Sequence, residues 1–460
     1  MKDLTRGSIP GQIMSLATLQ LVNSVASRAL ALLNIYWLGK LGAEAQAAVT
    51  VAINPLLVVL SVSPVMSVGA RVLVAQAVGA KDHERASKIF NETLGATLLV
   101  VAALGALGWA NRASFADWLS PDARTSALIS DFLQWMVFSV GLQIPVALIS
   151  AALGGTGNMK PGTFGQLAMV GVNFVLTPLL VFGWAGFPRL GVAGAGLASF
   201  ISVLSCLAGL SLYCAHVGSY LRLRPGLWFS RPQTLWSVLK VGSPMGVQSG
   251  VSALYMMCIT FFLQPFGPTE QAAFGVGQRL YQFAVIPLSA VGGAASVVVG
   301  QNYGAKRRDR VMVSFRGALL LGLACVPLPW LIAQFFPESI SRLFSEEPAV
   351  VAGSAEFLRT ISYCLFPVCV LYAANAVLSG IGNTLAILIT STTYAVAVAL
   401  PAWVLSYHPA FRPEWIWDLT LLGIVLETLG SLLFLRHELR SRLSARELPA
   451  SAHLTKMTFP

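Results

Sequence analysis

The segments QAVGAKDHERA (residues 76–86) and QNYGAKRRDRV (residues 301–311) are two copies of one loop in this chain of 460 residues. A shift of 225 residues superimposes them without a gap, and the same shift brings residues 155–158 onto residues 380–383. One ancestral unit was therefore duplicated. In a membrane protein built from two like halves, the site commonly lies between the halves, which rock against each other.

The composition places the chain in a lipid bilayer, because 56% of its residues are apolar, only 11% are charged and the mean hydropathy is +0.72. Each transmembrane helix needs about 20 mainly apolar residues. The strands of a membrane barrel alternate apolar and polar residues, and the long apolar runs of this chain do not, so we expect helices. The sequence predicts an all-α integral membrane protein with twelve transmembrane helices, in two six-helix lobes related by pseudo-twofold symmetry along the membrane normal. The predicted spans are residues 11–36, 45–76, 88–110, 126–152, 161–183, 190–215, 236–264, 272–300, 313–335, 354–380, 384–406 and 416–436.

The net charge of +11 is unevenly placed along the chain, because most Lys and Arg residues fall in alternate loops that share one side. The positive-inside rule then predicts a multi-pass protein of the bacterial inner (plasma) membrane with both termini in the cytoplasm. A nucleic-acid partner is not expected. The predicted divisions are an N-lobe (1–215), a cytoplasmic linker (216–235), a C-lobe (236–436) and a basic cytoplasmic tail (437–460).

Several segments together resemble the multidrug and toxic compound extrusion family of transporters. They are LTRGSIPGQI (4–13), NIYWLGKLGAEAQAAV (34–49), GQRLYQF (277–283), the paired loops quoted above, and the GTGN and GIGN motifs at 155–158 and 380–383. The resemblance implies twelve helices in two lobes around a V-shaped central cavity. It also implies export of organic, often cationic compounds in exchange for protons or sodium ions.

Helix one carries a polar stripe on one face, because its polar residues recur at helical spacing. The stripe either bonds to neighbouring helices or lines the N-lobe cavity. Beside it, Arg28 is a permanent cation inside a span, which costs about 2.5–3.5 kcal/mol by translocon scales unless it reaches the interface, a partner or water. Snorkelling and an anion-facing role both remain open. The stripe consists of Gln20, Asn23, Ser24, Ser27 and Asn34.

Two carboxylates that the family resemblance leads one to expect are absent. Asn34 stands where family members carry an acid five residues before the glycine that ends helix one, and helix five reads Asn173 and then Thr177 instead of Asn and Asp. These three residues can coordinate sodium or a substrate through neutral oxygens. They cannot exchange protons near neutral pH.

Glu427 is the acid that lies in the middle of a predicted span, helix twelve. Burial disfavours a charged carboxylate, so this position suits proton uptake. A structural partnership with a buried Arg or hydroxyl is the rival interpretation. Asp131 and Glu356 are repeat-matched acids expected near the membrane interface, where helix capping would explain them.

Helix seven has a broken polar face with adaptable methionines beside it, which is typical either of a promiscuous pocket or of ordinary packing. The residues are Gln248, Ser252, Tyr255, Thr260, Met256 and Met257.

Arg279 can order the C-lobe or pair with Glu270. In the paired loops, Gly79 and Gly304 are expected to allow a tight reversal. The loop residues Arg85 and Arg310 can meet lipid headgroups or pair with Asp82, Glu84 or Asp309, in a topogenic, structural or gating role.

No hydrolase triad, nucleotide-binding loop or metal motif stands in a loop, so we expect no enzyme activity, no metal and no cofactor beyond a coupling proton or sodium ion. The sequence predicts a secondary transporter that exports organic compounds by cation antiport and works as a monomer. Three alternatives remain: a flippase for a lipid-linked saccharide, an exporter of an anionic or neutral metabolite, and a channel or membrane-embedded receptor. Neither the substrate nor the coupling ion follows from the sequence.

Overall fold

The computed structural model describes residues 3–120, 122–216, 220–228 and 232–444, and within these ranges the regular structure is helical. The linker prediction therefore lies partly, and the tail prediction mostly, outside the described residues. The first half contains α1 (Ile9–Gly39), α2 (Ala43–Leu60), α3 (Val62–Gly79), α4 (His83–Ala110), α5 (Arg112–Leu119), α6 (Ala123–Gly155), α7 (Lys160–Phe182), η1 (Trp184–Gly186), α8 (Gly191–His216) and η2 (Pro225–Leu227). The second half contains α9 (Pro232–Leu263), η3 (Gln264–Phe266), α10 (Pro268–Gly304), α11 (Arg308–Cys325), α12 (Pro327–Phe335), α13 (Pro337–Ser341), α14 (Pro348–Ile361), η4 (Ser362–Cys364), α15 (Leu365–Ile381), α16 (Thr384–Leu405) and α17 (Pro413–Ser444).

Twelve helical segments of the described chain are long and apolar enough to cross a membrane, which confirms the predicted number of spans. Three predicted spans are divided: residues 313–335 into α11 and α12, residues 354–380 into α14, η4 and α15, and residues 45–76 into α2 and α3, with the break at Ser61. Pro64 follows closely in α3, and because proline has no N–H, it cannot donate to the carbonyl of Leu60. The short helices α5 and α13 were not expected.

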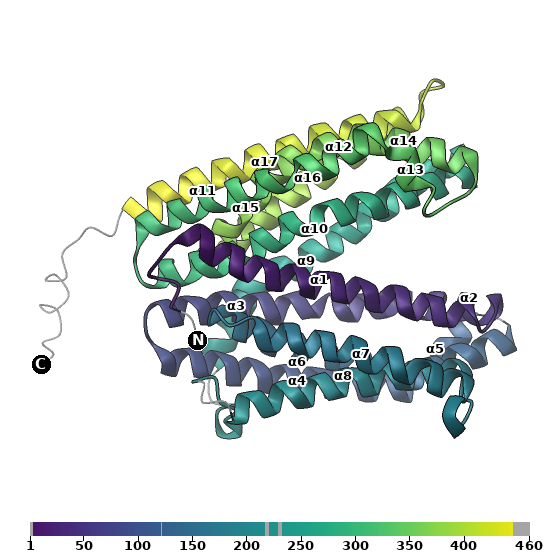
Figure 1. The fold of residues 1–460 in the computed structure, drawn as a ribbon, viewed down its shortest axis with the longest axis horizontal. Coiled ribbons are helices and arrows are strands. Elements are labelled where there is room, and N and C mark those ends of the chain that lie inside the picture. Colours follow the sequence, from purple (N-terminus) through teal and green to yellow (C-terminus); the bar gives the residue numbers. More distant parts are fainter. Residues whose placement is uncertain (1–2, 121, 217–219, 229–231, 445–460) are drawn as a thin grey trace, which may run out of the picture.

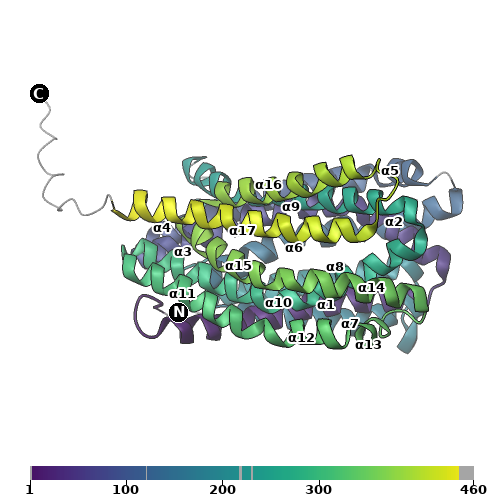
Figure 2. The ribbon, with the colours of Figure 1, turned by 90° about the horizontal axis from the view of Figure 1, so that it is seen from above.

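The helices form two lobes that diverge from a shared end (Figure 1). Helices α1–α8 make one lobe and α9–α17 the other. The described chain begins and ends at the same end of the bundle, which we call the terminal end (Figure 2). The lobes spread apart toward the opposite end, where α2 and α13 lie.

Each lobe has its own apolar core, and a third cluster joins the lobes. Phe90 and Ile149 are buried in the first lobe, and Phe357 is buried in the second. In the third cluster, Ile13 of α1 packs with Val298 of α10 and is fully buried. Helix α1 therefore belongs to the first lobe in sequence but packs closely on the second.

The duplication holds at helix boundaries as well as in sequence. Helices α4 and α11 start at His83 and Arg308, and the same shift of 225 relates them. The loops before them reverse at Lys81 (φ 60°) and Lys306 (φ 58°), which take the left-handed conformation. The expectation that glycine makes this reversal was therefore wrong, because Gly79 and Gly304 are still helical there.

Candidate functional site

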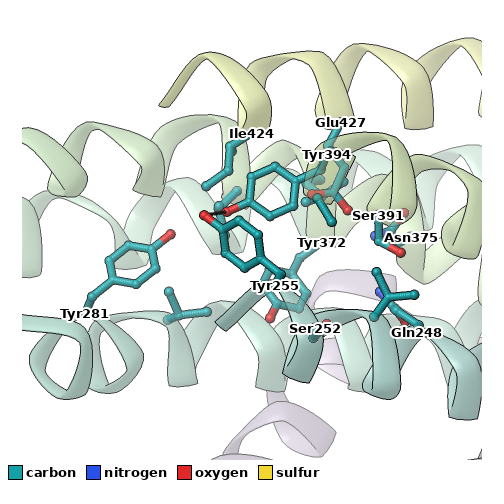
Figure 3. Close-up of a pocket in the computed structure, with 15 residues that line it drawn as sticks. Gln248, Ser252, Tyr255, Tyr281, Tyr372, Asn375, Ser391, Tyr394, Ile424 and Glu427 are labelled. Atoms are coloured by element: carbon teal, nitrogen blue, oxygen red, sulfur yellow. Dashed lines mark hydrogen bonds between the residues drawn. The ribbon is translucent and has the colours of Figure 1, made fainter. Parts of the chain in front are cut away.

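A cavity of about 350 Å³ lies inside the second lobe, between α9, α10, α15, α16 and α17 (Figure 3). Its wall is aromatic and polar, and it contains one carboxylate. The lining includes Gln248, Ser252, Tyr255, Tyr281, Tyr372, Asn375, Ser391, Tyr394 and Glu427. Among the C-lobe residues predicted for a substrate cavity, Gln248, Ser252 and Tyr255 therefore lie in one cavity, whereas Met256 is outside its lining.

A chain of hydroxyl groups fixes two of the tyrosines. The Tyr394 hydroxyl donates to the Tyr255 hydroxyl at 2.9 Å, and the Tyr255 hydroxyl lies 3.2 Å from Thr420 Oγ1 on α17. The two rings are tilted by 51°, with their centroids 5.0 Å apart. Figure 3 shows their hydroxyl groups meeting within the cavity. Rings held in this way present faces that attract cations.

Glu427 is 8% exposed and lines the same cavity. It makes no hydrogen bond and no ion pair with any residue that the structure describes, so no structural partner of the kind considered above is found there. Asn375 Oδ1, in the wall of the same cavity, is buried and accepts no hydrogen bond from a described residue. A carboxylate buried without a partner is costly when charged, so it favours binding a proton or a cationic group.

The first lobe has no counterpart of this site. At the positions related to the four tyrosines by the repeat, the chain has Leu30, Leu56, Ala147 and Met169, and Ser202 corresponds to Glu427. Leu56 and Met169 are buried in the apolar cores of the first lobe, and Ser202 is also buried, with 1% of its surface exposed. At these matched positions, the first copy therefore lacks the tyrosines and the carboxylate that line the cavity of the second.

The Arg28 side chain contacts α10 of the second lobe. Its Nη1 donates to Gln282 Oε1 of α10 at 3.2 Å, and its guanidinium lies 5.8 Å from the ring centroid of Phe283. Gln282 is fourteen residues from the start of α10, or about 21 Å along the helix. Arg28 therefore reaches from the first lobe to the second at the middle depth of the bundle.

The rest of the polar stripe on α1 makes few contacts between helices. Gln20 lies against Gly293 of α10, where an added Cβ would come within 3.8 Å of its side chain. Ser27 donates to the Asn23 carbonyl within the same helix at 3.0 Å. Asn34 is half-buried and makes no hydrogen bond among the described residues.

Asn173 and Thr177 come together in α7 as the sequence spacing predicts. Thr177 Oγ1 donates to Asn173 Oδ1 at 3.2 Å, and Asn173 Nδ2 donates to Ser199 Oγ of α8 at 3.4 Å. Both residues are almost completely buried. Asn173 thus links α7 to α8, Thr177 is bonded within α7, and Asn34 makes no hydrogen bond to either.

The two lobes are closed against each other at the terminal end by a pair of symmetric contacts. Gln76 Nε2 donates to the Gly380 carbonyl, and Gln301 Nε2 donates to the Gly155 carbonyl, each at 2.9 Å. A Cβ at Gly79 would lie 1.9 Å from the Gln301 carbonyl oxygen, and one at Gly304 would lie 2.0 Å from that of Gln76. These glycines therefore permit close approach of the lobes.

Arg310 holds the N-terminal segment. Its guanidinium donates to the carbonyls of Leu4 and Gly7 and to Asn302 Oδ1, instead of pairing with Asp309. The repeat-matched Arg85 is exposed, and its side chain makes no hydrogen bond or ion pair with a described residue.

Arg279 is exposed on α10 and makes no ion pair with Glu270 within the described part of the chain. Glu270 lies instead within electrostatic range of Glu356 and Glu414. Asp131, the repeat mate of Glu356, is exposed on α6.

Sequence reasoning missed Tyr281, Tyr372, Asn375, Ser391 and Tyr394. They come from three helices and have no common spacing, so no local pattern joins them to Glu427. The usable signal was the repeat itself, because each of the three tyrosines replaces an apolar residue of the other copy.

The sequence profile of the MatE family matches residues 20–179 and 244–404, once in each lobe. Similar proteins include the FAD transporter of Shewanella oneidensis, which is 23% identical over 87% of this chain and 89% of its own length. A probable multidrug resistance protein NorM of Deinococcus radiodurans is 29% identical over 81% of this chain and 82% of its own. The multidrug export protein MepA of Staphylococcus aureus is 22% identical over 74% of each chain.

Solved structures share the fold. A MATE transporter in complex with MaL6 superimposes with a TM-score of 0.86 at 18% identity, covering 96% of this chain and 98% of its own. A MOP superfamily transporter from Pyrococcus furiosus, described as having a binding pocket of reverse polarity, gives a TM-score of 0.85 with the same identity and coverage. Glu427 lies beyond both segments that the family profile matches.

Proposed function

The chain belongs to the MatE family of multidrug efflux transporters, and from this premise we propose that it exports aromatic organic cations in exchange for protons. Twelve helices in the described part of the chain are long and apolar enough to cross a membrane, which supports a multi-pass membrane protein. We further propose that it acts as a monomer and catalyses no covalent chemistry.

The observation that carries this proposal is Glu427, which is buried, has no partner among the described residues and lines a cavity with four tyrosines. The tyrosine faces attract an organic cation. The carboxylate neutralises its charge, and Asn375 Oδ1 offers a free acceptor. A proton on Glu427 removes the negative charge that holds the cation. The proton and the organic cation therefore compete for the Glu427 carboxylate, and such competition produces exchange.

A sodium-coupled mechanism has less support. Sodium prefers several oxygen ligands that are free to coordinate it. In the first lobe, Asn173 Oδ1 and Thr177 Oγ1 are already bonded to each other. Asn34 is not joined to them.

We place the terminal end in the cytoplasm, because the basic loops at residues 81–88 and 306–310 lie there and cationic loops favour the cytoplasmic side. The lobes then meet at the cytoplasmic end and diverge toward the outside. Rocking of the lobes would break the Gln76 and Gln301 contacts, so that the cavity faces each side in turn.

The test uses purified full-length protein in proteoliposomes with rhodamine 123, an aromatic cation, and proton and sodium gradients imposed separately. We expect a proton gradient alone to drive accumulation of the dye, and Glu427→Gln to abolish it. Asp418→Asn is the matched control, because it makes the same change at an exposed position of α17. Proton-driven transport that persists in Glu427→Gln would overturn the assignment of Glu427.

Export of an anionic metabolite is a second candidate. The similar Shewanella oneidensis protein is named an FAD transporter, and Arg28 is a cation beside the cavity lobe with a neutral hydrogen-bond partner. Counterflow of labelled FAD in the same vesicles tests it. Exchange of FAD without exchange of rhodamine 123 would favour this candidate.

A further inference from the structure

A groove of about 470 Å³ lies on the surface of the first lobe, between α7 and α8. Figure 1 places α8 on the side of this lobe that is turned away from the second lobe, so the groove faces the surrounding bilayer. It takes no part in the proposed exchange. Its polar end contains Asn158, Lys160 and Tyr213, and its apolar part contains Gly165, Ala168, Cys206 and Gly209.

The length of the groove is close to the depth of one leaflet. Lys160 is the first residue of α7, and Ala168 lies eight residues further on, which is about 12 Å along the helix. The hydrocarbon core of a bilayer is about 30 Å thick, so one leaflet spans about 15 Å. A chain that lies in the groove and starts at Lys160 would therefore run as an acyl chain does, from headgroup level toward the bilayer centre.

Glycine residues shape the apolar part of the groove. Gly209 of α8 is exposed, and no atom lies within 4 Å of a Cβ added there, so a side chain at this position would occupy open space. A Cβ added at Gly165 of α7 would lie 3.0 Å from Cys206 Sγ of α8. The two helices are thus close together at Gly165, while the space at Gly209 remains available to an apolar chain.

The polar end of the groove offers donors that meet no acid among the described residues. Lys160 is exposed and makes no ion pair with a described residue. The Tyr213 hydroxyl accepts a hydrogen bond from Asn158 Nδ2 at 3.0 Å, which orients it and leaves its O–H free of a described acceptor. No side chain caps the N-terminus of α7, and its first turn contains no acidic residue. An ammonium group, a hydroxyl donor and a helix N-terminus together favour a phosphate.

The repeat shows that the duplicated scaffold does not require this groove. At the matching positions of the second lobe, Leu385 replaces Lys160 and Phe434 replaces Gly209. The second copy therefore has an apolar side chain where the first has a cation, and an aromatic ring where the first has open space.

The hydrogen bond at the polar end also differs between the two copies. Asn158 of the first lobe donates to the Tyr213 hydroxyl, whereas the matching Asn383 donates to the Glu438 carboxylate at 2.7 Å. A carboxylate at this position repels a phosphate, and a phenol can donate to one. The two copies thus keep the same local bond but offer opposite electrostatic environments to a lipid headgroup.

We propose that the groove between α7 and α8 binds one anionic phospholipid, with its phosphate at Lys160 and Tyr213 and one acyl chain along Gly165 and Gly209. The site lies in the first lobe only, because the matching face of the second lobe has an acid at the headgroup position and a phenyl ring at the chain position. The inference goes beyond the proposed transport and does not depend on it.

Native mass spectrometry of the delipidated full chain tests the headgroup contact, with phosphatidylglycerol and phosphatidylcholine that carry the same acyl chains. We expect the first phosphatidylglycerol to bind at least about fivefold more tightly than phosphatidylcholine, and Lys160→Leu to reduce this preference to within about twofold. Arg436→Leu is the matched control, because it removes an exposed cation near the C-terminal end of α17, in the second lobe, and should keep the preference.

Gly209→Phe tests the chain contact, because its ring would occupy the space assigned to the acyl chain. We expect it to weaken binding of phosphatidylglycerol at least about tenfold. Lys160→Leu and Gly209→Phe each install the residue that the second copy already carries, and Gly209→Leu fills the same space if the phenyl variant has a lowered Tm. Glycerol 3-phosphate, a headgroup without chains, should not displace the lipid.

Equal binding of the two lipids by the wild type would overturn the inference. An equal loss of preference in Lys160→Leu and Arg436→Leu would also overturn it, because the chain would then respond only to general surface charge. Unchanged phosphatidylglycerol binding in both Gly209 variants would show that the acyl chain lies elsewhere. Displacement of the lipid by an equal concentration of glycerol 3-phosphate would reveal a phosphate site that needs no lipid, and would reject the groove as a lipid site.

Discussion

Gln76 donates a hydrogen bond across the lobes to the carbonyl oxygen of Gly380 at 2.9 Å. The repeat supplies the reciprocal contact, from Gln301 to Gly155 at the same distance. Each lobe therefore contributes one donor and one acceptor to the same closure. Each of the two repeat-matched bonds can be removed by a single substitution, so the contribution of each one to the closure can be measured.

The variant Gln76→Ala/Gln301→Ala should favour opening at the terminal end. Two hydrogen bonds contribute about 1–3 kcal/mol together, so the ratio of open to closed molecules should rise at least about fivefold. Spin labels at the repeat-matched exposed positions Glu84 and Asp309, in a cysteine-free background, report the distance between lobes. Gln264→Ala, at the opposite end, is the control. An unchanged distance distribution in the double variant would show that these bonds do not hold the closure.

Gly79→Ala should hinder closure of the lobes without unfolding the helix. The new Cβ would lie 1.9 Å from the Gln301 carbonyl oxygen, so the backbone must shift when the lobes close. That shift should cost about 1–3 kcal/mol of the free energy of closure. Alanine meanwhile favours the helix by about 1 kcal/mol. We expect about tenfold slower proton-driven transport with a near-normal Tm. Gly275→Ala is the control, because no atom lies within 4 Å of its added Cβ. Normal transport by Gly79→Ala would contradict the close-approach argument.

Tyr255→Phe should destabilise the second lobe more than Tyr394→Phe. Tyr255 is the middle of the hydroxyl chain, so its loss removes two hydrogen bonds and leaves the Tyr394 hydroxyl without its acceptor. We expect the free energy of unfolding to fall by about 1–3 kcal/mol in Tyr255→Phe and by about 1 kcal/mol in Tyr394→Phe. Thermal unfolding in detergent measures both, with the 74% exposed Tyr407→Phe as control. The reverse order of Tm values would show that the hydroxyl chain is not formed as described.

Thr177→Val should lower stability and leave ion coupling unchanged. It removes the donor to the buried Asn173 Oδ1, at a cost of about 1 kcal/mol or more. Proton-driven dye transport should keep its rate in the presence and absence of sodium, because the proposed exchange uses Glu427. If sodium stimulates the wild type and the variant loses that response, the first lobe carries the coupling site.

Arg310→Ala should release the N-terminal segment, whereas Arg85→Ala should not. Arg310 donates to the carbonyls of Leu4 and Gly7, and the matched Arg85 makes no such bond. Hydrogen bonds from a charged group contribute about 1.5–3 kcal/mol, so amide exchange at residues 4–7 should accelerate at least about tenfold. Hydrogen-exchange mass spectrometry measures this rate. Equal acceleration in both variants would point to a general loosening of the loops.

The class of the protein, the number of spans and the duplication could all be predicted before the fold was known. These properties depend on local features: apolar runs long enough for a bilayer, and a register that repeats after 225 residues. Glu427 could also be singled out, because an acid inside a span is rare and costly. The contact between Asn173 and Thr177 followed from their spacing on one helix.

The surroundings of these residues depend on how the helices pack against one another. Tyr281, Tyr372 and Tyr394 line one cavity with Glu427 because α10, α15, α16 and α17 turn particular faces toward one another. When a helix is apolar on all sides, its sequence gives little indication of which face packs against which neighbour. The partner of Arg28 was hidden for the same reason, since Gln282 lies 254 positions away on the other lobe. The apolar composition of a helix is enough to place it in the membrane, but only packing between helices determines which of its polar groups contact one another.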